Sequence, residues 1–476
     1  MSYKKFIASK TRKMQPAGFD PATINPMLFD WQASVVRWAV RRGRAAIFAD
    51  CGLGKTPMQL EWAASVVRQT GGRVIVHCPV GVRQQTKREA EKFCLDVPVS
   101  VVDEQSQVRD GISLVNYEKL HRLDASSFVG VVLDESSILK SLDGKTRRQL
   151  TEAYKDTQYR LACSATPAPN DYMEIGNQCE WLGVMRREEM LATFFVHDGG
   201  ETSKWRLKGH ATADFWEWLS SWCVFMRRPS DIGFGDDGYH LPKLNYIDHV
   251  LDHGRPQQGM LFSMPASTLA DRRNARKETA SERIEFVADL VNRSDGPWVC
   301  WVNLNNEGEE LTAAIDGAVE IAGRHTDTYK EDQLSAFAEG RVRVLVTKPR
   351  ICGFGMNWQH VCRTAIYPTD SWEQWYQMVR RFWRYGQTRD VEVHCVLSEL
   401  ETTVLDNIRS KEREADEMIA GVVSAMRESS IHELRRDRFQ DSYKPTQRVK
   451  VPSWLQNAST VDAAKTGCSI AATAAT

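Results

Sequence analysis

The 476-residue sequence lacks several patterns that mark large classes of protein. No apolar run approaches the roughly 18 residues that cross a bilayer, and the basic N-terminal segment has no apolar core of the kind that a secretory signal needs. The eleven cysteines form no Cys-x-x-Cys pair, so no zinc or redox motif is indicated. We therefore expect a protein without a membrane partner, in the cytoplasm or encoded by a phage and active in its host's cytoplasm. The cysteines should be small buried side chains in a reducing compartment.

The chain also lacks net charge, with 62 Lys and Arg against 62 Asp and Glu. A strongly basic whole, the simplest signature of a nucleic-acid-binding protein, is therefore absent. The charge is unevenly placed, however. Residues 299–340 hold 2 basic and 9 acidic side chains, a net of −7, and residues 341–390 hold 9 and 3, a net of +6. The zero net charge of the whole chain thus does not exclude a polyanionic partner. Such a partner would bind at the basic stretch, residues 341–390.

Short β-rich runs alternate with longer amphipathic stretches in two parts of the chain, a pattern typical of parallel sheets with crossover helices. The expected strands of the first part are 45–49, 74–78, 113–116, 129–133 and 159–163. Those of the second part are 246–251, 297–302, 342–347, 364–367 and 391–397. Helices are expected over 57–68, from a capping box at 279–282 to about 291, and over 401–430.

The segment between these two parts differs from both in composition, because it contains five tryptophans, at positions 181, 205, 216, 218 and 222. We expect a helical or irregular insertion whose tryptophans pack in a core, although stacking on nucleobases is an alternative. The predicted organisation is an arm over 1–27, a lobe over 28–180, the Trp-rich insertion or linker over 181–240, a second lobe over 241–400, and a helical extension with a tail over 401–476.

A phosphate-binding loop is the strongest signal. Residues 49–56 read Ala-Asp-Cys-Gly-Leu-Gly-Lys-Thr between an expected strand and an expected helix, which is the context such a loop needs. Glycines let backbone amides surround phosphates, and the helix presents its positive end to them. Lys55 supplies a charge to the β- and γ-phosphates, and the Thr56 hydroxyl is a ligand for Mg²⁺.

Two further patterns fit nucleotide chemistry. Asp134 and Glu135 follow the apolar strand 129–133, at the end of a strand where open α/β sheets bind ligands. In these positions Asp134 would hold Mg²⁺, and Glu135 would orient or deprotonate the attacking water. Arg381 and Arg384 lie one helical turn apart, so two guanidinium groups would point the same way toward a triphosphate.

In order along the chain, these motifs resemble superfamily 2 helicases and translocases, and among them the Swi/Snf-type DNA translocases. The phosphate loop resembles motif I, and 134–140 (Asp-Glu-Ser-Ser-Ile-Leu-Lys) resembles motif II. Residues 161–167 (Leu-Ala-Cys-Ser-Ala-Thr-Pro), followed by Asn170, resemble motif III. Residues 353–357 (Gly-Phe-Gly-Met-Asn) resemble motif V, and 377–387, ending Arg-Tyr-Gly-Gln, resemble motif VI of the Swi/Snf branch.

The resemblance implies two tandem RecA-like parallel-sheet lobes with ATP and Mg²⁺ bound between them. It implies that Gln32 reads adenine, that Gly52, Gly54 and Gly355 line the nucleotide site, and that Arg384 is the arginine finger. In motif V it makes Lys348, Arg350 and Asn357 candidates for contact with nucleic acid. Motif II departs from the family, since Ser136-Ser137 stands where Ala-His is usual. That histidine usually couples hydrolysis to motif III.

The resemblance implies an ATP hydrolase that translocates on double-stranded DNA without sequence specificity. Two alternatives stay open at this point. One is a helicase that separates strands of DNA or RNA. The other is an ATP-binding scaffold without turnover, suggested by Ser137 and opposed by Lys55, Glu135 and Arg384. Protein partners are not indicated.

Overall fold

The computed structural model describes residues 17–141, 144–168, 172–198, 201–251, 279–352, 357–369 and 371–429. All of them lie in the compact unit that extends to Leu434. Gly355 and Asn170, which belong to or follow the predicted motifs, and the predicted tail from residue 430 onward lie outside the described residues.

Lobe 1 is built on a seven-stranded sheet in the order β3-β4-β2-β5-β6-β1-β9, in which every paired strand is parallel. Its central strands are buried on both faces, as the continuous apolar runs predict. The strands are β1 (Arg44–Ala49), β2 (Val74–Cys78), β3 (Val99–Val101), β4 (Ile112–Asn116), β5 (Gly130–Asp134), β6 (Tyr159–Ser164) and β9 (Cys223–Met226). The helices are α2 (Asp30–Arg42), α3 (Lys55–Thr70), α4 (Arg83–Lys92), α5 (Lys145–Ala153), α6 (Ile175–Leu182), α7 (Arg187–Phe194) and α8 (Thr212–Ser220).

The Trp-rich segment contributes to the core of lobe 1. Its strand β9 pairs with β1, with Ala46 opposite Cys223 and Ala49 opposite Met226. Trp181, Trp216, Trp218 and Trp222 are all buried in the lobe 1 core. Packing is therefore their role, as expected. Trp205 lies in an antiparallel hairpin of β7 (Phe195–Asp198) and β8 (Glu201–Leu207), where its ring packs against His197 at 3.7 Å between centroids.

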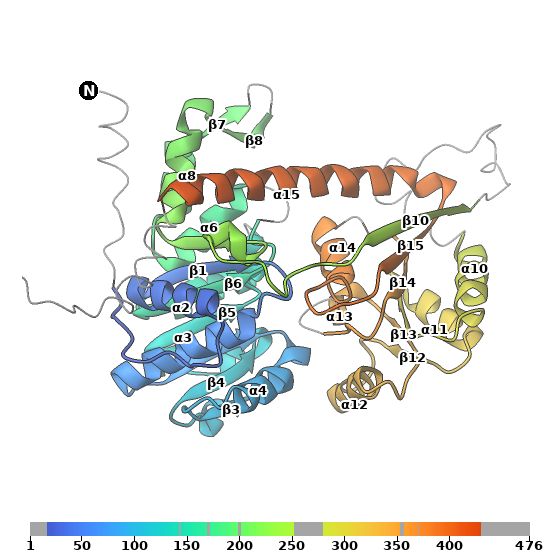
Figure 1. Cartoon of the computed structure of the whole chain (residues 1–476), viewed down its shortest axis with the longest axis horizontal. Coiled ribbons are helices and arrows are strands. Elements are labelled where there is room, and N and C mark those ends of the chain that lie inside the picture. The colour runs from blue at the N-terminus through green and yellow to red at the C-terminus, as the bar shows by residue number, and fades with distance from the viewer. Residues whose placement is uncertain are drawn as a thin grey trace, which may run out of the picture. The chain divides into compact units, whose positions relative to one another are not determined.

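Lobe 2 is a six-stranded sheet in the order β10-β15-β14-β11-β13-β12, and again all pairs are parallel (Figure 1). The strands are β10 (Leu244–Leu251), β11 (Trp298–Trp301), β12 (Ala318–Ile321), β13 (Val344–Thr347), β14 (Arg363–Ile366) and β15 (Val391–Ser398). The helices are α10 (Ala280–Asn292), α11 (Asn305–Ala314), α12 (Asp327–Ala338), α13 (Pro349–Cys352) and α14 (Trp372–Val379). Two parallel α/β lobes confirm the predicted fold class. Helix α10 begins where the capping box predicts, but without a side-chain cap from Thr279.

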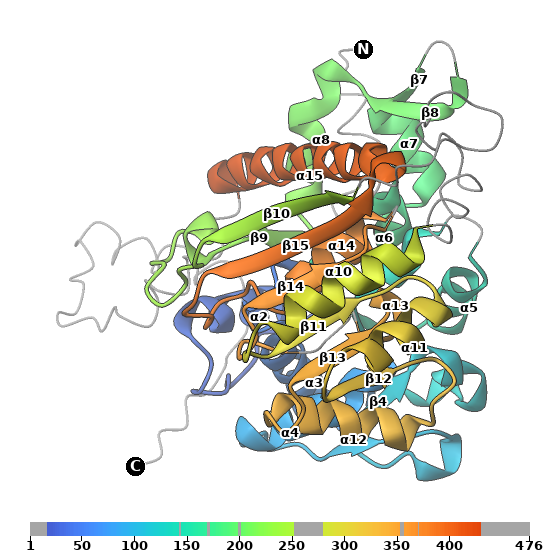
Figure 2. The ribbon, with the colours of Figure 1, turned by 90° about the vertical axis from the view of Figure 1, so that its right-hand side faces the viewer.

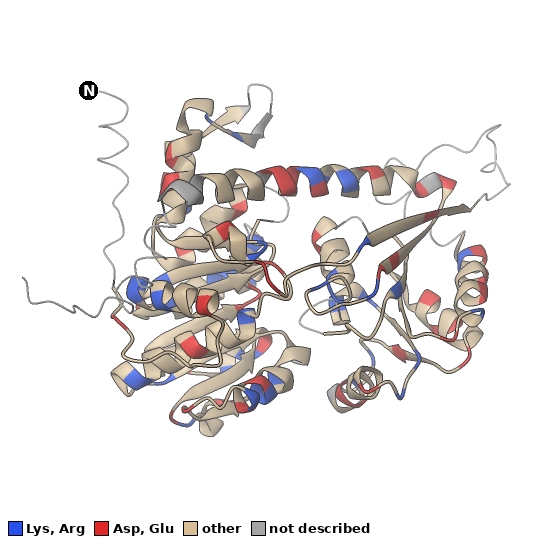
Figure 3. Cartoon of the chain, viewed as in Figure 1, with Lys and Arg blue, Asp and Glu red and all other residues tan. Residues whose placement is uncertain are grey.

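The last described helix, α15 (Thr402–Ser429), is 28 residues long and belongs to both cores. Val404, Leu405 and Ile408 near its start pack in the core of lobe 2, and Val422 near its end packs in the core of lobe 1. Figures 1 and 2 both show it passing beside α8. Charges of both signs alternate along it (Figure 3). Among the described residues no helix combines the length and apolarity that crossing a membrane requires.

Candidate active site

The phosphate loop connects β1 to α3 at the carboxyl edge of the lobe 1 sheet. Gly52 and Gly54 have φ angles of +90° and +70°, in the left-handed region that glycine adopts without strain. Gly54 is also held close, since a Cβ there would lie 2.4 Å from the Gln32 amide nitrogen. Lys55 Nζ donates to the carbonyls of Ala49 (2.7 Å) and Asp50 (3.3 Å). The ammonium group is therefore held at the loop, and Thr56 follows it in the first turn of α3.

Gln32 ties the start of α2 to the phosphate loop. Its Oε1 accepts from Phe29 N at 3.0 Å, capping α2, and its Nε2 donates to the Leu53 carbonyl at 3.1 Å. The side chain is 3% exposed. Gln32 thus lies beside the nucleotide-binding loop, as the resemblance implies, with both ends of its amide in use within the protein. Its reading of adenine stays a prediction.

The two carboxylates of motif II lie at the end of β5, where Asp134 is the last residue of the strand and Glu135 follows it. In the sheet, β6 separates β5 from β1, the strand that precedes the phosphate loop. Burial, reinforced by repulsion from Glu135, raises the pKa of Asp134 to about 7, and the charge of Lys55 acts in the opposite direction. Glu135 itself has a φ of +68°, which is unusual for a residue with a side chain. The backbone of β5 is held in place by Tyr117, whose hydroxyl donates to the Asp134 carbonyl at 2.7 Å.

Two serine hydroxyls converge on one oxygen of Glu135. Ser137 Oγ donates to Glu135 Oε1 at 3.0 Å, and Ser164 Oγ of motif III donates to the same oxygen at 2.5 Å. Both serines are buried, and Ser164 Oγ also accepts from Thr166 N at 3.0 Å. Motif II lacks the histidine that usually connects it to motif III. Here the two motifs are connected through the Glu135 carboxylate, which accepts from Ser137 of motif II and Ser164 of motif III. Sequence reasoning missed this arrangement because hydroxyl pairs carry no spacing signal.

We expect Ser137→Ala to lower kcat for ATP hydrolysis about tenfold with little change in KM. A hydrogen bond to a charged group contributes about 1.5–3 kcal/mol, and about 1.4 kcal/mol is a factor of ten in rate. The measurement is steady-state ATPase kinetics. Ser136→Ala is the matched control, because the Ser136 hydroxyl is buried with no hydrogen-bond partner among the described residues. Equal rates in the two variants would show that the bond to Glu135 is irrelevant to turnover.

Motif VI of lobe 2 lies against the phosphate loop. Arg381 donates from Nη2 to Cys51 Sγ at 3.8 Å and to Gln377 Oε1 at 2.7 Å. Burial, with the charge of Arg381 adding to it, lowers the pKa of Arg384, while Cys51 and Glu89 of lobe 1 act in the opposite direction. Tyr385 lies against the loop too, since a Cβ on Gly52 would be 2.9 Å from its backbone nitrogen. The structure thus brings the predicted arginines to the same loop as Lys55. They are not one helical turn apart as predicted, because α14 ends at Val379 and both arginines lie in the turns that follow it.

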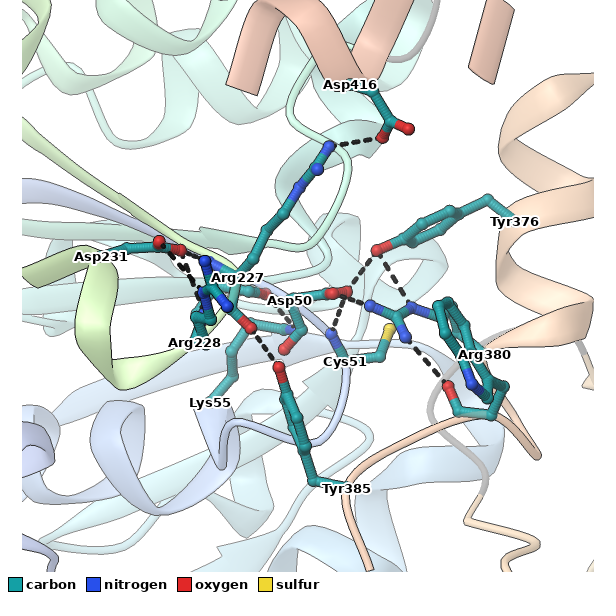
Figure 4. Close-up of polar contacts among 12 residues, drawn as sticks. Asp50, Cys51, Lys55, Arg227, Arg228, Asp231, Tyr376, Arg380, Tyr385 and Asp416 are labelled. Carbon is teal, nitrogen blue, oxygen red and sulfur yellow. Dashed lines mark hydrogen bonds and ion pairs between the residues drawn. The ribbon is translucent and has the colours of Figure 1, made fainter. Parts of the chain in front are cut away.

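A buried ion pair between motifs I and VI involves two residues, Asp50 and Arg380, for which the motifs predict no role. The Asp50 carboxylate pairs with Arg380 and accepts from the Tyr376 hydroxyl (Figure 4). It also accepts from the Cys51 amide at 2.6 Å. The sequence does contain one indication of this pair. Asp50 is an acidic residue inside a phosphate-binding loop, where a carboxylate needs a cation nearby to compensate its charge.

The three residues predicted to contact nucleic acid have different surroundings. Arg350 is exposed and lines a cavity of about 390 Å³ that also meets Glu135, Ser137 and Lys140. Lys348 is bonded to the Asn305 side chain at the start of α11, and Asn357 is exposed. Their contact with nucleic acid stays a prediction.

The donor set fits Mg²⁺ held partly by its substrate. No group of three or more His, Cys, Asp or Glu that could hold a metal lies in the parts of the chain that the structure describes. Magnesium at phosphate sites needs only one or two protein ligands, because phosphates and waters complete the shell. Thr56 and the carboxylate of Asp134 would supply those ligands, and a cation beside Asp134 would favour its ionised form.

No protein-family model matches the chain, and no curated protein matches it. Among solved structures, the chain is similar to the Sulfolobus solfataricus SWI2/SNF2 ATPase core in complex with dsDNA. The identity is 17% and the TM-score 0.41, over 88% of this chain and 98% of that one. This is the family that the sequence motifs resemble.

Proposed function

We propose that this protein is an ATP hydrolase whose two lobes act as a nucleic-acid motor that translocates on double-stranded DNA. One observation supports it above the others. Lys55 and the Asp134–Glu135 pair lie at the carboxyl edge of one parallel sheet, and Arg381 and Arg384 of the other lobe lie at the same phosphate loop. Complementary halves of a phosphoryl-transfer site on separate lobes make turnover depend on how the lobes meet.

In this proposal each side chain has a defined task. The loop amides and Lys55 bind the phosphates, and Thr56 and Asp134 hold Mg²⁺, which neutralises phosphate charge when bound. Glu135, oriented by Ser137 and Ser164, takes the proton of the attacking water. Arg381 and Arg384 stabilise the charge that develops on the transferred group. Polymer bound across both lobes would favour the approach of the arginines, and release of products would favour separation.

Duplex DNA is proposed as the track because motif VI ends in the Arg-Tyr-Gly-Gln of the Swi/Snf branch. Lys348 and Arg350 are the proposed phosphate contacts, and Asn357 is a further proposed contact with the nucleic acid. Contacts to phosphates make binding independent of sequence and sensitive to salt.

The deciding experiment measures ATPase rate without nucleic acid and with single-stranded DNA, duplex DNA and RNA. It then tests displacement of a third strand from a triplex and of one strand from a duplex. We expect stimulation by duplex DNA and triplex displacement without unwinding. Unwinding would support the helicase alternative instead. Absence of turnover with every polymer would support the scaffold alternative and refute the ATPase.

Glu135→Gln tests the chemical assignment. The amide keeps the shape of the side chain but cannot accept the proton, so we expect kcat to fall at least about 100-fold, within the range typical of a general base. ATP binding, measured by fluorescence of a labelled nucleotide, should persist. Turnover near that of the parent would refute the role of Glu135.

A further inference from the structure

The pair between Asp50 and Arg380 is buried at the contact between the phosphate loop and motif VI. Their side chains are 6% and 5% exposed. The carboxylate has three donors, namely the Cys51 amide, the Tyr376 hydroxyl and Arg380. A buried ion pair is retained at a cost in desolvation, so its partners must be closely satisfied. Both members of this pair have such partners. Asp50 belongs to lobe 1 and Arg380 to lobe 2, so the pair joins the two lobes.

Arg380 also fixes the turn that carries the predicted arginine finger. Its Nη1 donates to the Trp383 carbonyl at 3.0 Å, and its guanidinium lies 4.6 Å from the centre of the Trp383 ring. Trp383 directly precedes Arg384, and its Nε1 donates to the Pro242 carbonyl at 2.7 Å. One guanidinium therefore joins the phosphate loop to the residue before Arg384.

A second pair fixes the other end of α14. Glu373, in its first turn, pairs with Lys140, which ends the 3₁₀ turn of motif II (Ser136–Lys140). Arg380 follows the last turn of α14. The helix is thus held to motif II at its start and to motif I at its end, which sets its register along lobe 1.

We propose that Arg380 is a positioning residue, which pairs with Asp50 to set how lobe 2 meets the phosphate loop and so places Arg384 at the nucleotide. The pair also neutralises the one carboxylate inside the loop, so the charges of Lys55, Arg381 and Arg384 remain available to a triphosphate. A displacement of about 1 Å at a reacting centre can cost about 100-fold in rate. This inference rests on the proposed ATPase function.

The test is a double-mutant cycle with Arg380→Gln, Asp50→Asn and the two combined, measured for kcat, KM and affinity for a non-hydrolysed ATP analogue. We expect each single variant to lower kcat about 10- to 100-fold while analogue affinity stays within about threefold. The double variant should be no worse than the more affected single one, because the substitutions remove the same pair. It leaves no unpaired charge, so it stays informative where a single variant folds poorly. Arg363→Gln is the matched control, since Arg363 pairs with Glu392 on the partly exposed surface of β14 and β15, and its kcat should match the parent's.

A measurement without ATP separates this inference from the proposed function. Small-angle scattering of the nucleotide-free protein should give a larger radius of gyration for Arg380→Gln and Asp50→Asn than for the parent or Arg363→Gln. Unchanged scattering in both variants, additive losses in kcat, or losses that appear in analogue affinity instead would overturn the positioning role. Absence of turnover in the parent with every polymer would refute the ATPase and leave the scattering result standing.

Discussion

Arg384→Ala should lower kcat about 10³-fold or more and leave ATP binding nearly intact. An arginine finger typically contributes 10³–10⁵ in rate, because it stabilises charge that is present only as the phosphoryl group transfers. In this protein the loss should be near the full amount. Lys55 lies on the other lobe at the loop carbonyls, and Arg381 is already bonded to Gln377, so neither can take its place. Single-turnover kinetics with saturating nucleotide measures the chemical step directly.

The control for that loss is Arg389→Ala, five residues further along. Arg389 is exposed and donates to the His360 carbonyl, away from the phosphate loop. The kcat of the Arg389→Ala variant should lie within about twofold of the parent's kcat. A comparable loss in both variants would mean that the region is disturbed as a whole and would contradict a specific role for Arg384.

The largest expected effect on stability is that of Arg283→Met in lobe 2. Arg283 pairs with Glu307 at 3.0 Å and Glu401 at 3.3 Å, and all three side chains are 0% exposed. Its guanidinium also lies 4.9 Å from the centre of the Tyr367 ring. Without it two buried carboxylates lose their shared counter-charge, which typically costs about 3–5 kcal/mol. Hydrogen exchange of β11 and α10 amides should reveal the loss within lobe 2.

Two comparisons make that prediction specific. Arg293→Met removes an exposed ion pair with Asp289 on the same helix, and such pairs contribute about 0–1 kcal/mol, so exchange should be almost unchanged. Adding Glu307→Gln and Glu401→Gln to Arg283→Met should recover much of the stability, because no unpaired charge remains. If the triple variant were no more stable than Arg283→Met, packing around Tyr367 and not charge would explain the effect.

The sequence predicts the parts of this protein that depend on local patterns. Long apolar runs place the central strands within a residue or two, and the phosphate loop, the Asp134–Glu135 pair and the arginines of motif VI come together in the structure as their motifs indicate. The chemical roles of these residues stay predictions until turnover is measured.

What the sequence does not predict is non-local. Strand β9 has only four residues, and its partner β1 lies far back in the chain, so no local pattern relates the two strands. Edge strands β3 and β12 are also short, with three and four residues. Asp50 and Arg380 are 330 residues apart (380 − 50 = 330), and no periodicity relates them. The bonds from Ser137 and Ser164 to Glu135 depend on side-chain direction, which a motif does not encode.

Helix α15 bears on how the lobes can move. The chain leaves lobe 1 after β9 and enters lobe 2 at β10, and α15 then carries it back from the lobe 2 core to the lobe 1 core. Arg227 at the first crossing is bonded to Asp416 of the second at 2.5 Å. Two lobes that are joined by a single chain connection can rotate about any axis relative to each other. Joined by two linked connections, they lose most of that freedom. In the proposed motor, successive cycles of ATP hydrolysis would therefore repeat the same relative movement of the lobes.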